Sequence, residues 1–323
     1  MQFSLDDLEW ASELVARHVP PTPQYAWPLL AATVGTEVWV KHENHTPTGA
    51  FKVRGGLVYA ERLKRERPEV NGLVSATRGN HGQSLALAGR AAGLSVTIVV
   101  PHGNSSDKNA SMRGFGAELI EHGHDFQEAR EFASTIGAER GLEVVPPFHP
   151  DLVLGVATYA RELFGAAGDL DAVYVPVGMG SGICALIGVR DLLGLRTEIV
   201  GVVAANAPAT ARSVAAGHVV VTERADTFVD GVAARSPDAD AIAIISKGAA
   251  RIVEVSEDAA AEAMRVLFAT THNVAEPAGA LALAGVLAER ESAFGKRVAV
   301  IQTGGNVDAS LLRDVLSGKT PAA

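Results

Sequence analysis

Short apolar runs alternate along the chain with longer segments in which apolar residues recur every three or four positions. The runs predict strands at 37–43, 72–76, 95–100, 117–122, 142–147, 171–177, 198–203 and 297–303. Several are almost continuously apolar, which is typical of strands covered on both faces of a parallel sheet. The alternation therefore predicts an α/β fold with a mostly parallel sheet and right-handed crossovers.

Apolar stripes between these runs predict amphipathic or buried helices. Segment 124–141 gathers its apolar residues on one face: Phe126, Ala129, Ala133 and Ile136. Ser256 before two acids predicts a capped helix start, followed by a buried stripe of Met264, Leu267 and Phe268. Segment 279–288 predicts a buried helix, since it is far shorter than the roughly 20 residues that span a bilayer.

Composition narrows the class of protein. A chain of 323 residues exceeds one ordinary core, so two domains or one large α/β unit are expected. The net charge of −9 argues against nucleic acid as a partner. A lone cysteine, Cys184, and an acidic start without an export signal lead us to expect a cytoplasmic protein, and no membrane partner is expected.

Three predicted strand ends run into glycine-rich turns, at 75–86, 174–185 and 300–308. Backbone N–H groups and the helix dipole favour anions at such junctions, although glycines there also form ordinary turns. The sequence GMGSG at 178–182 does not match a dinucleotide fingerprint, because Ile183 stands where a small residue is required. It also lacks the Gly-Lys-Ser/Thr of a nucleotide loop. A phosphate cradle without a nucleotide is the remaining interpretation.

The stretch AFKVRGG at 50–56 places Lys52 directly after Phe51. One interpretation is an ordinary helix start with a solvated lysine. The other is a reactive amine, which requires its pKa of about 10.4 to be lowered by desolvation or Schiff-base formation. The heptapeptide alone leaves both open.

Taken in order, these motifs resemble the pyridoxal-phosphate-dependent serine/threonine dehydratases. The resemblance rests on Phe51-Lys52, Gly-Asn-His around Asn80, the glycine loop 178–182, Thr303 before Gly-Gly-Asn, and EPAGA at 276–280. It spans nearly the whole chain and implies the tryptophan-synthase-β-like fold type II, with two open twisted, mostly parallel sheets flanked by helices. It also implies a large cofactor domain of 1–70 and 147–323, and a small mobile substrate-closing domain of 71–146.

The resemblance assigns roles to the matching residues. Lys52 would form the Schiff base with pyridoxal 5'-phosphate, Phe51 would lie near its ring, Asn80 would bind the ring hydroxyl, and Thr303 would face the pyridine nitrogen. Backbone amides of the glycine loop would hold the phosphate: Gly178, Met179, Gly180, Ser181 and Gly182. The substrate would be bound by the turn that contains Thr77, Arg78, Asn80 and His81.

The implied reaction is β-elimination from a hydroxy amino acid such as threonine, serine or 3-phenylserine, giving a 2-oxo acid and ammonia. Lys52 would remove the Cα proton, and the β-hydroxyl would leave after protonation, with the cofactor phosphate as donor. The Thr303 hydroxyl cannot keep the ring nitrogen protonated as a carboxylate would. This weaker electron sink suits elimination better than a long-lived carbanion.

Arg78 departs from the family pattern, which has a small residue there, or in the racemases a serine that serves as second base. A guanidinium is a poor base, so racemisation is not expected. Arg78 either forms a salt bridge at the rim, or selects the substrate by pairing with a second carboxylate, as in 3-hydroxyaspartate, or by stacking on an aryl group.

Other candidates receive plainer interpretations. The family's cation site draws on a segment that here, at 203–209, has no acid, so no metal is expected. His42 and His45 are interpreted as scaffold, and Cys184 as a buried filler. Glu276 is either an acid beside the ring or a carboxylate at a helix start.

The sequence as a whole thus predicts a cytoplasmic, homodimeric lyase. The chain has no room for the regulatory domain of biosynthetic threonine dehydratases, so a catabolic role without isoleucine feedback is expected. Two alternatives remain: a β-replacement enzyme on the same fold, and a non-catalytic amino-acid-binding protein. Ammonia release without an added nucleophile would argue against the β-replacement enzyme. A reducible adduct on the lysine would exclude the non-catalytic binding protein.

Overall fold

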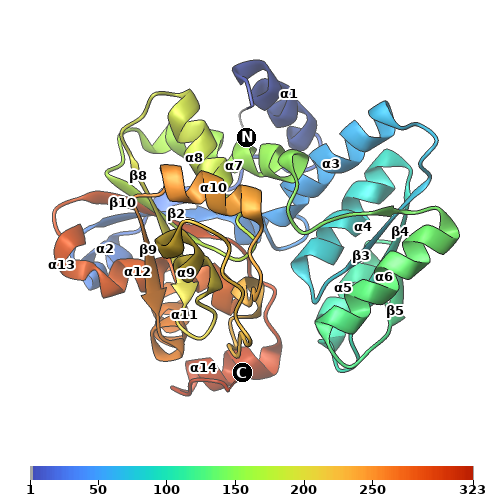
Figure 1. Cartoon of the computed structure of the whole chain (residues 1–323). Helices are drawn as coiled ribbons and strands as arrows, with labels where there is room; N and C mark the ends of the chain where they lie inside the picture. Colours follow the sequence, from blue (N-terminus) through green and yellow to red (C-terminus); the bar gives the residue numbers. More distant parts are fainter. Residues whose placement is uncertain (1–2, 323) are drawn as a thin grey trace. The chain divides into compact units, whose positions relative to one another are not determined.

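The computed structural model describes residues 3–322 and contains the alternating strands and helices of an α/β protein (Figure 1). The strands are β1 Gln24–Ala26, β2 Glu37–His42, β3 Gly72–Ala76, β4 Ser95–Val100, β5 Glu118–Glu121, β6 Glu143–Val144, β7 Ala172–Pro176, β8 Glu198–Ala204, β9 Arg251–Val255 and β10 Arg297–Gln302. The predicted α/β class with two mostly parallel sheets is confirmed.

The helices lie between the strands. They are α1 Leu5–Ala16, α2 Pro28–Val34, α3 Lys52–Glu66, α4 Asn80–Ala92, α5 Ser106–Gly114, α6 Phe126–Arg140, α7 Pro150–Ala167, α8 Ser181–Leu192, α9 Ala209–Ala216, α10 Ala239–Gly248, α11 Glu257–Thr271, α12 Pro277–Ala288, α13 Arg290–Ala293 and α14 Ala309–Leu316. Two short 3₁₀ helices, η1 Glu43–His45 and η2 Asp230–Val232, interrupt the loops.

The described chain forms two compact units. Unit 1 consists of the residues up to Leu5, Pro21–His45, and the chain from Tyr159 onward, and unit 2 consists of Asp6–Pro20 and Thr46–Thr158. The sequence placed the division after residues 70 and 146 instead. The difference has a local cause, because α3 packs along α4 and therefore groups with the segment that follows it. The substrate-closing motion of the small domain remains a prediction.

Unit 1 is built on a six-stranded sheet in the order β1-β2-β10-β7-β8-β9. Only β1 is antiparallel, pairing with β2, and the other pairs are parallel. Helices cover both faces: Gly285 of α12 lies against Val202, whereas Ile183 of α8 lies against the neighbouring Gly201. Because successive strand residues point to opposite faces, this sheet is buried on both sides, as its continuous apolar runs predict.

Unit 2 contains a four-stranded parallel sheet in the order β5-β4-β3-β6. Helix α6 packs on Val74 and Val99, while Gly89 of α4 lies against Val96, which faces the opposite way along β4. A side chain at Gly89 would collide with Val96, so the glycine sets how closely α4 approaches its sheet.

All eight predicted strands are present, with shifts of a few residues at their ends. The sequence patterns missed β1 and β9, which are edge strands without a continuous buried run. The prediction that Phe126 and Phe268 lie on buried helix faces is also wrong. Each is 38% exposed, because it lies at the end of its apolar stripe. Within residues 3–322, every helix is either too short or too polar to cross a bilayer.

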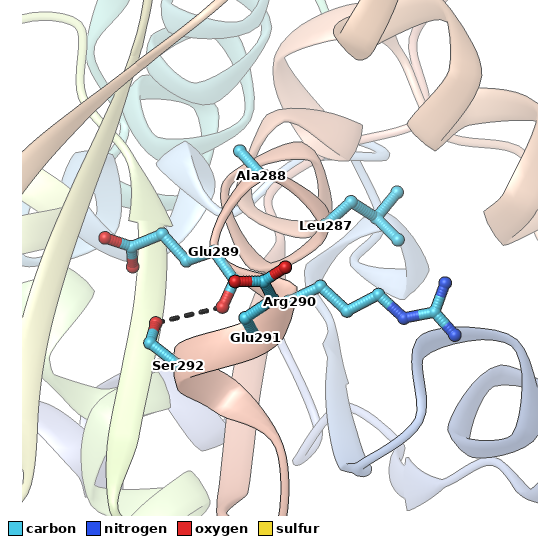
Figure 2. A pocket seen from close by; sticks show the side chains of 6 residues that line it. All are labelled: Leu287, Ala288, Glu289, Arg290, Glu291 and Ser292. Atoms are coloured by element: carbon cyan, nitrogen blue, oxygen red, sulfur yellow. Dashed lines mark hydrogen bonds between the residues drawn. The ribbon is translucent and has the colours of Figure 1, made fainter.

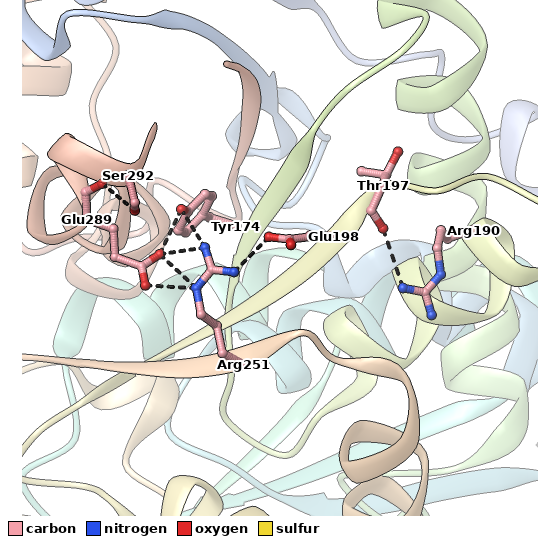
Figure 3. A network of polar contacts seen from close by, with 7 residues as sticks. All are labelled: Tyr174, Arg190, Thr197, Glu198, Arg251, Glu289 and Ser292. Carbon is pink, nitrogen blue, oxygen red and sulfur yellow. Dashed lines mark hydrogen bonds and ion pairs between the residues drawn. The ribbon is translucent and has the colours of Figure 1, made fainter. Parts of the chain in front are cut away.

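A charged network stabilises the sheet of unit 1 at the end where β8 and β9 begin (Figure 3). The Arg251 guanidinium donates to both Glu289 oxygens, each at 2.8 Å, and to Glu198 at 2.7 Å. The Tyr174 hydroxyl donates to Glu289 at 2.8 Å. Burial and the neighbouring Glu289 raise the pKa of Tyr174 to about 12, so the phenol remains a donor.

Replacing Glu289→Gln should destabilise the protein by about 1–2 kcal/mol, because the bidentate partner of Arg251 is lost. Hydrogen bonds from Arg251 lower the pKa of Glu289, so this contribution exists above pH 4.5 and disappears as the pH falls further. Urea denaturation at pH 7 measures the effect. Asp314→Asn, at an exposed surface pair, is the matched control, and equal values for both variants would contradict the prediction.

Candidate active site

The first candidate residue, Lys52, lies in unit 2, at the beginning of α3. Lys52 is the first residue of the helix, and its Nζ lies 4.5 Å from the centre of the Phe51 ring. The preceding loop is held by Thr46, whose Oγ1 donates to the Ala50 carbonyl at 2.8 Å and accepts from the Ala50 amide at 2.9 Å. Lys52 is half-buried. The structure thus places this amine against an aromatic face, which differs from a fully solvated lysine.

Helix α4 supports Lys52 from the side. Ser84 Oγ donates to the Lys52 carbonyl at 2.6 Å, and the absence of a side chain on Gly56 makes room for Ser84 between the helices. His81 lies one turn before Ser84, so it shares the face directed at α3. Burial, and to a lesser degree the charge of Lys52, lowers the pKa of His81 to about 3. The imidazole is therefore neutral at physiological pH.

The predicted substrate turn follows the end of β3. Thr77 is buried, its Oγ1 accepts from the Gly79 amide at 3.1 Å, and α4 begins at Asn80 without a side-chain cap. Uncapped helix starts favour anionic groups. Arg78 is exposed, and among the described residues it forms no ion pair. The salt-bridge interpretation of Arg78 therefore finds no partner in the described part of the chain.

The glycine loop lies in unit 1, between β7 and α8. Gly180 precedes α8 with a φ of 100° and no side-chain cap. A Cβ at Gly178 would approach the Gly231 carbonyl oxygen to 2.7 Å, and one at Gly180 would approach Ala241 Cβ to 2.9 Å. Both positions therefore require glycine. The loop forms a narrow backbone cradle at the positive end of a helix, which fits a phosphate group.

Thr303 lies on the same edge of this sheet. It directly follows β10, the strand paired in parallel with β7, and it is buried. Because parallel strands end at one edge, Thr303 and the glycine loop occupy the edge where ligands bind in such sheets. Glu276 precedes α12 and is buried without capping that helix through its side chain, while its amide donates to Gly304 at 3.1 Å.

The remaining candidate residues make contacts within the fold. His42 Nε2 accepts from the Trp27 indole at 3.0 Å, and His45 bonds Asn273 at 2.6 Å. Cys184 is buried, and burial raises the pKa of its thiol to about 12, which fits the predicted filler role. No group of three or more metal-ligating side chains was found in the part of the chain that the structure describes.

A surface hollow of about 450 Å³ lies elsewhere, where α12 meets α13 (Figure 2). It is lined by Leu287–Ser292. Glu289 joins it to the Arg251 network, at the end of the sheet where strands begin. The hollow is open and contains no predicted site residue, so we assign it no part in the chemistry.

Several supporting residues carry no signal in the sequence. Ser84 holds Lys52, Gly231 closes the glycine loop, and the Tyr159 hydroxyl donates to the Gly182 carbonyl at 3.1 Å. In each of these three contacts the two residues lie between 23 and 53 positions apart in the sequence. No spacing pattern in the sequence could have indicated these contacts.

Comparisons with known proteins bear on the family of this chain. A family model described as pyridoxal-phosphate dependent enzyme matches residues 15–304. The chain is 30% identical to L-threo-3-hydroxyaspartate ammonia-lyase of Saccharomyces cerevisiae over 310 residues, covering 96% of this chain and 95% of that protein. It is 31% identical to L-threonine ammonia-lyase of Thermotoga maritima over 316 residues, covering 98% and 78%.

A solved structure shares the same architecture. Processed threonine deaminase isoform 2 from Solanum lycopersicum superposes with a TM-score of 0.89 at 27% identity, covering 98% of this chain and 94% of that one. The chain belongs to the pyridoxal-phosphate-dependent enzymes, and pyridoxal 5'-phosphate is its cofactor. The predicted resemblance, fold type and cofactor are confirmed, while the roles of individual residues remain predictions.

The lowered pKa values of His42 and His81 predict acid-sensitive stability. Burial lowers the pKa of His42 to about 4 and that of His81 to about 3, from 6.5. Below pH 6.5 the unfolded chain binds a proton at each histidine and the folded chain does not, so the fold loses stability as the pH falls toward those values. Each histidine should therefore lower the free energy of unfolding by about 2 kcal/mol when the pH falls from 7 to 5.

Urea denaturation of the apoprotein at both pH values, compared with His81→Asn, isolates one of these contributions. The variant should lose about 2 kcal/mol less than the wild type over this interval. His124→Asn, in an exposed turn, is the control. An identical pH dependence for all three proteins would show that His81 is charged or exposed in solution.

Proposed function

We propose that this chain is an ammonia-lyase that dehydrates a β-hydroxy amino acid to a 2-oxo acid and ammonia. The observation that carries the proposal is the Lys52 amine, held on the Phe51 ring at a helix start, in a chain whose relatives are named ammonia-lyases. The uncapped glycine loop before α8 supports it, because it offers an anionic cofactor group a fixed set of amides.

The residues present fit the cofactor. Lys52 would supply the amine for its aldehyde, and Gly178–Gly182 would supply amides for its phosphate. A side chain at Gly178 or Gly180 would collide with neighbouring atoms. Asn80 would bind the ring hydroxyl, and Thr303 would face the ring nitrogen. When bound, the cofactor withdraws electrons from the substrate Cα and so acidifies its C–H bond.

The chain's own residues then complete the elimination. Lys52 would take the Cα proton of the bound substrate, and the β-hydroxyl would leave as water once it is protonated. The enamine product tautomerises and is hydrolysed to a 2-oxo acid and ammonia. Thr303 offers a hydroxyl in place of a carboxylate, which favours rapid loss of the leaving group over a persistent carbanion.

The substrate carboxylate would be held by the turn Thr77–His81 at the start of α4. The uncapped helix start supplies backbone N–H groups and positive dipole, and Thr77 Oγ1 fixes the turn through Gly79. The neutral His81 can add a hydrogen bond without adding charge. Arg78, exposed in the middle of this turn, supplies the positive charge beside it.

Assembly and location complete the proposal. We propose a cytoplasmic homodimer, and the single buried Cys184 is consistent with a reducing compartment. Cell fractionation and sedimentation equilibrium of the purified protein test these two points independently of catalysis.

Lys52→Ala should abolish 2-oxo acid formation, with a loss of at least about 1,000-fold, because the proton acceptor is removed. Borohydride reduction followed by peptide mass spectrometry should find the cofactor on Lys52 in the wild type. Lys64→Ala, near the end of the same helix, should keep full activity. An adduct on another lysine would sink the assignment. Ammonia release that depends on an added nucleophile would instead favour β-replacement.

Arg78→Ala should lower kcat/KM for 3-hydroxyaspartate by about 10- to 100-fold relative to threonine, since a charge-assisted bond to the second carboxylate is lost. A 2-oxo acid assay with threonine, serine, 3-phenylserine and 3-hydroxyaspartate measures the ranking. Arg113→Ala, at an exposed ion pair with Glu121, is the control. An unchanged ranking would show that Arg78 does not select substrates, and a selective loss on phenylserine would indicate stacking.

A further inference from the structure

A second polar cluster lies in unit 1, where β2 and β10 end. His42 and Gln302 are the last residues of these strands, face each other in the parallel register, and are 1% and 0% exposed. Asn44 follows in η1. None of the three has a place in the reaction described above, and buried polar side chains of this kind require defined partners.

The direction of the hydrogen bonds in this cluster can be deduced. The Trp27 indole N–H donates to His42 Nε2 at 3.0 Å, and an indole nitrogen can only donate. Burial and the neighbouring His45 lower the pKa of His42 to about 4, so the ring is neutral. Its single proton must therefore be on Nδ1, which makes Nδ1 a donor.

Two oxygen acceptors match that donor. His42 Nδ1, Gln302 Oε1 and Asn44 Oδ1 are all buried, and none of them makes a hydrogen bond of normal geometry. Gln302 and Asn44 act on His42 as hydrogen-bond acceptors would, since both favour its protonated form. One N–H donor and two amide oxygens can form hydrogen bonds with one another. A protonated Nδ1 cannot bind a metal ion, because its lone pair is not available.

The amide nitrogens of the same two side chains hold the next loop. Gln302 Nε2 donates to the Val274 carbonyl at 3.0 Å, and Asn44 Nδ2 donates to the same oxygen at 3.4 Å. Val274 lies two residues before Glu276, whose amide donates to Gly304 at 3.1 Å. Thr303 therefore lies between Gln302 and Gly304. Gln302 holds Val274, and Gly304 holds Glu276, through these hydrogen bonds.

We propose that Trp27, His42 and Gln302 form a relay that positions Thr303 and Glu276 for the cofactor ring, which rests on the proposed function for the roles of those two residues. His42 is a positioning residue in this relay. Trp27 sets its tautomer, the Nδ1 proton orients the Gln302 amide, and the oriented amide holds Val274.

Loss of the indole donor should disturb every later contact. Without it the His42 proton can move to Nε2, so that Nδ1 becomes an acceptor facing amide oxygens. Relief of that repulsion requires the Gln302 amide to turn over, which gives up its bond to Val274. The loop before Glu276 and the backbone at Thr303 should then loosen together.

The test compares Trp27→Phe with Trp39→Phe. Trp39 is a matched control, since its indole donates to Glu37 at 2.7 Å on the same strand but outside the relay. The imidazole nitrogens of the apoprotein are observed by ¹⁵N NMR, with the His42 signals assigned from His42→Asn. Wild type and Trp39→Phe should show the proton on Nδ1, and Trp27→Phe a mixture of tautomers.

Cofactor affinity and kinetics supply the second readout. Trp27→Phe should weaken pyridoxal 5'-phosphate binding and lower kcat by about tenfold each, shift the absorption maximum of the bound cofactor, and leave KM within about twofold. Trp39→Phe should match the wild type. A tautomer change without any effect on affinity, spectrum or kcat would overturn the relay, as would an unchanged tautomer.

A second pair of variants covers the case in which Trp27→Phe does not fold. The amide nitrogen of His42→Asn replaces the Nδ1 donor, whereas His42→Leu cannot donate. The asparagine variant should bind the cofactor within about threefold of the wild type, and the leucine variant about tenfold more weakly. Equal losses in both would refute the relay. If the wild type makes no 2-oxo acid, the proposed function fails, while the tautomer and affinity measurements still decide the relay.

Discussion

The insertion of β10 between β2 and β7 is the constraint on which unit 1 depends. A strand from the end of the chain pairs in parallel with one from near its beginning and one from its middle. Since parallel strands end at one edge, this pairing gathers Thr303, the glycine loop after β7 and the His42–Gln302 pair there. Any change that shifted the register of β10 would displace all three features together.

Close backbone approach at glycine shapes the candidate phosphate site at this edge. Gly178 and Gly180 stand where a side chain would collide with Gly231 or Ala241, so the backbone itself lines the cradle. In unit 2 a second uncapped helix start follows Gly79, beside the turn proposed for the substrate carboxylate. Each unit thus contributes one helix start suited to an anion, and both arise where a strand turns sharply into a helix.

The two edges of the unit 1 sheet hold polar groups of different kinds. Where the strands begin, Arg251, Glu289 and Tyr174 form a charged, partly exposed network that supports stability. Where they end, His42 and Gln302 are buried and Trp27 is partly buried. All three are neutral, and their hydrogen bonds have a fixed direction. Neutral groups suit the proposed cofactor site, because a buried charge there would disturb the electronics of the ring, whereas a directed amide only holds the backbone.

The sequence by itself determined the fold class, eight of the described strands and the order of the motifs, because apolar periodicity and glycine-rich junctions are local properties. It could not reveal β1 and β9, which have no buried run, nor the exposure of Phe126 and Phe268 at the ends of their stripes. Only the tertiary structure decided three supporting contacts, namely those of Ser84 with Lys52, of Gly231 with the glycine loop and of Trp27 with His42. These contacts depend on which elements pack together, and packing is set by the whole chain rather than by any short pattern within it.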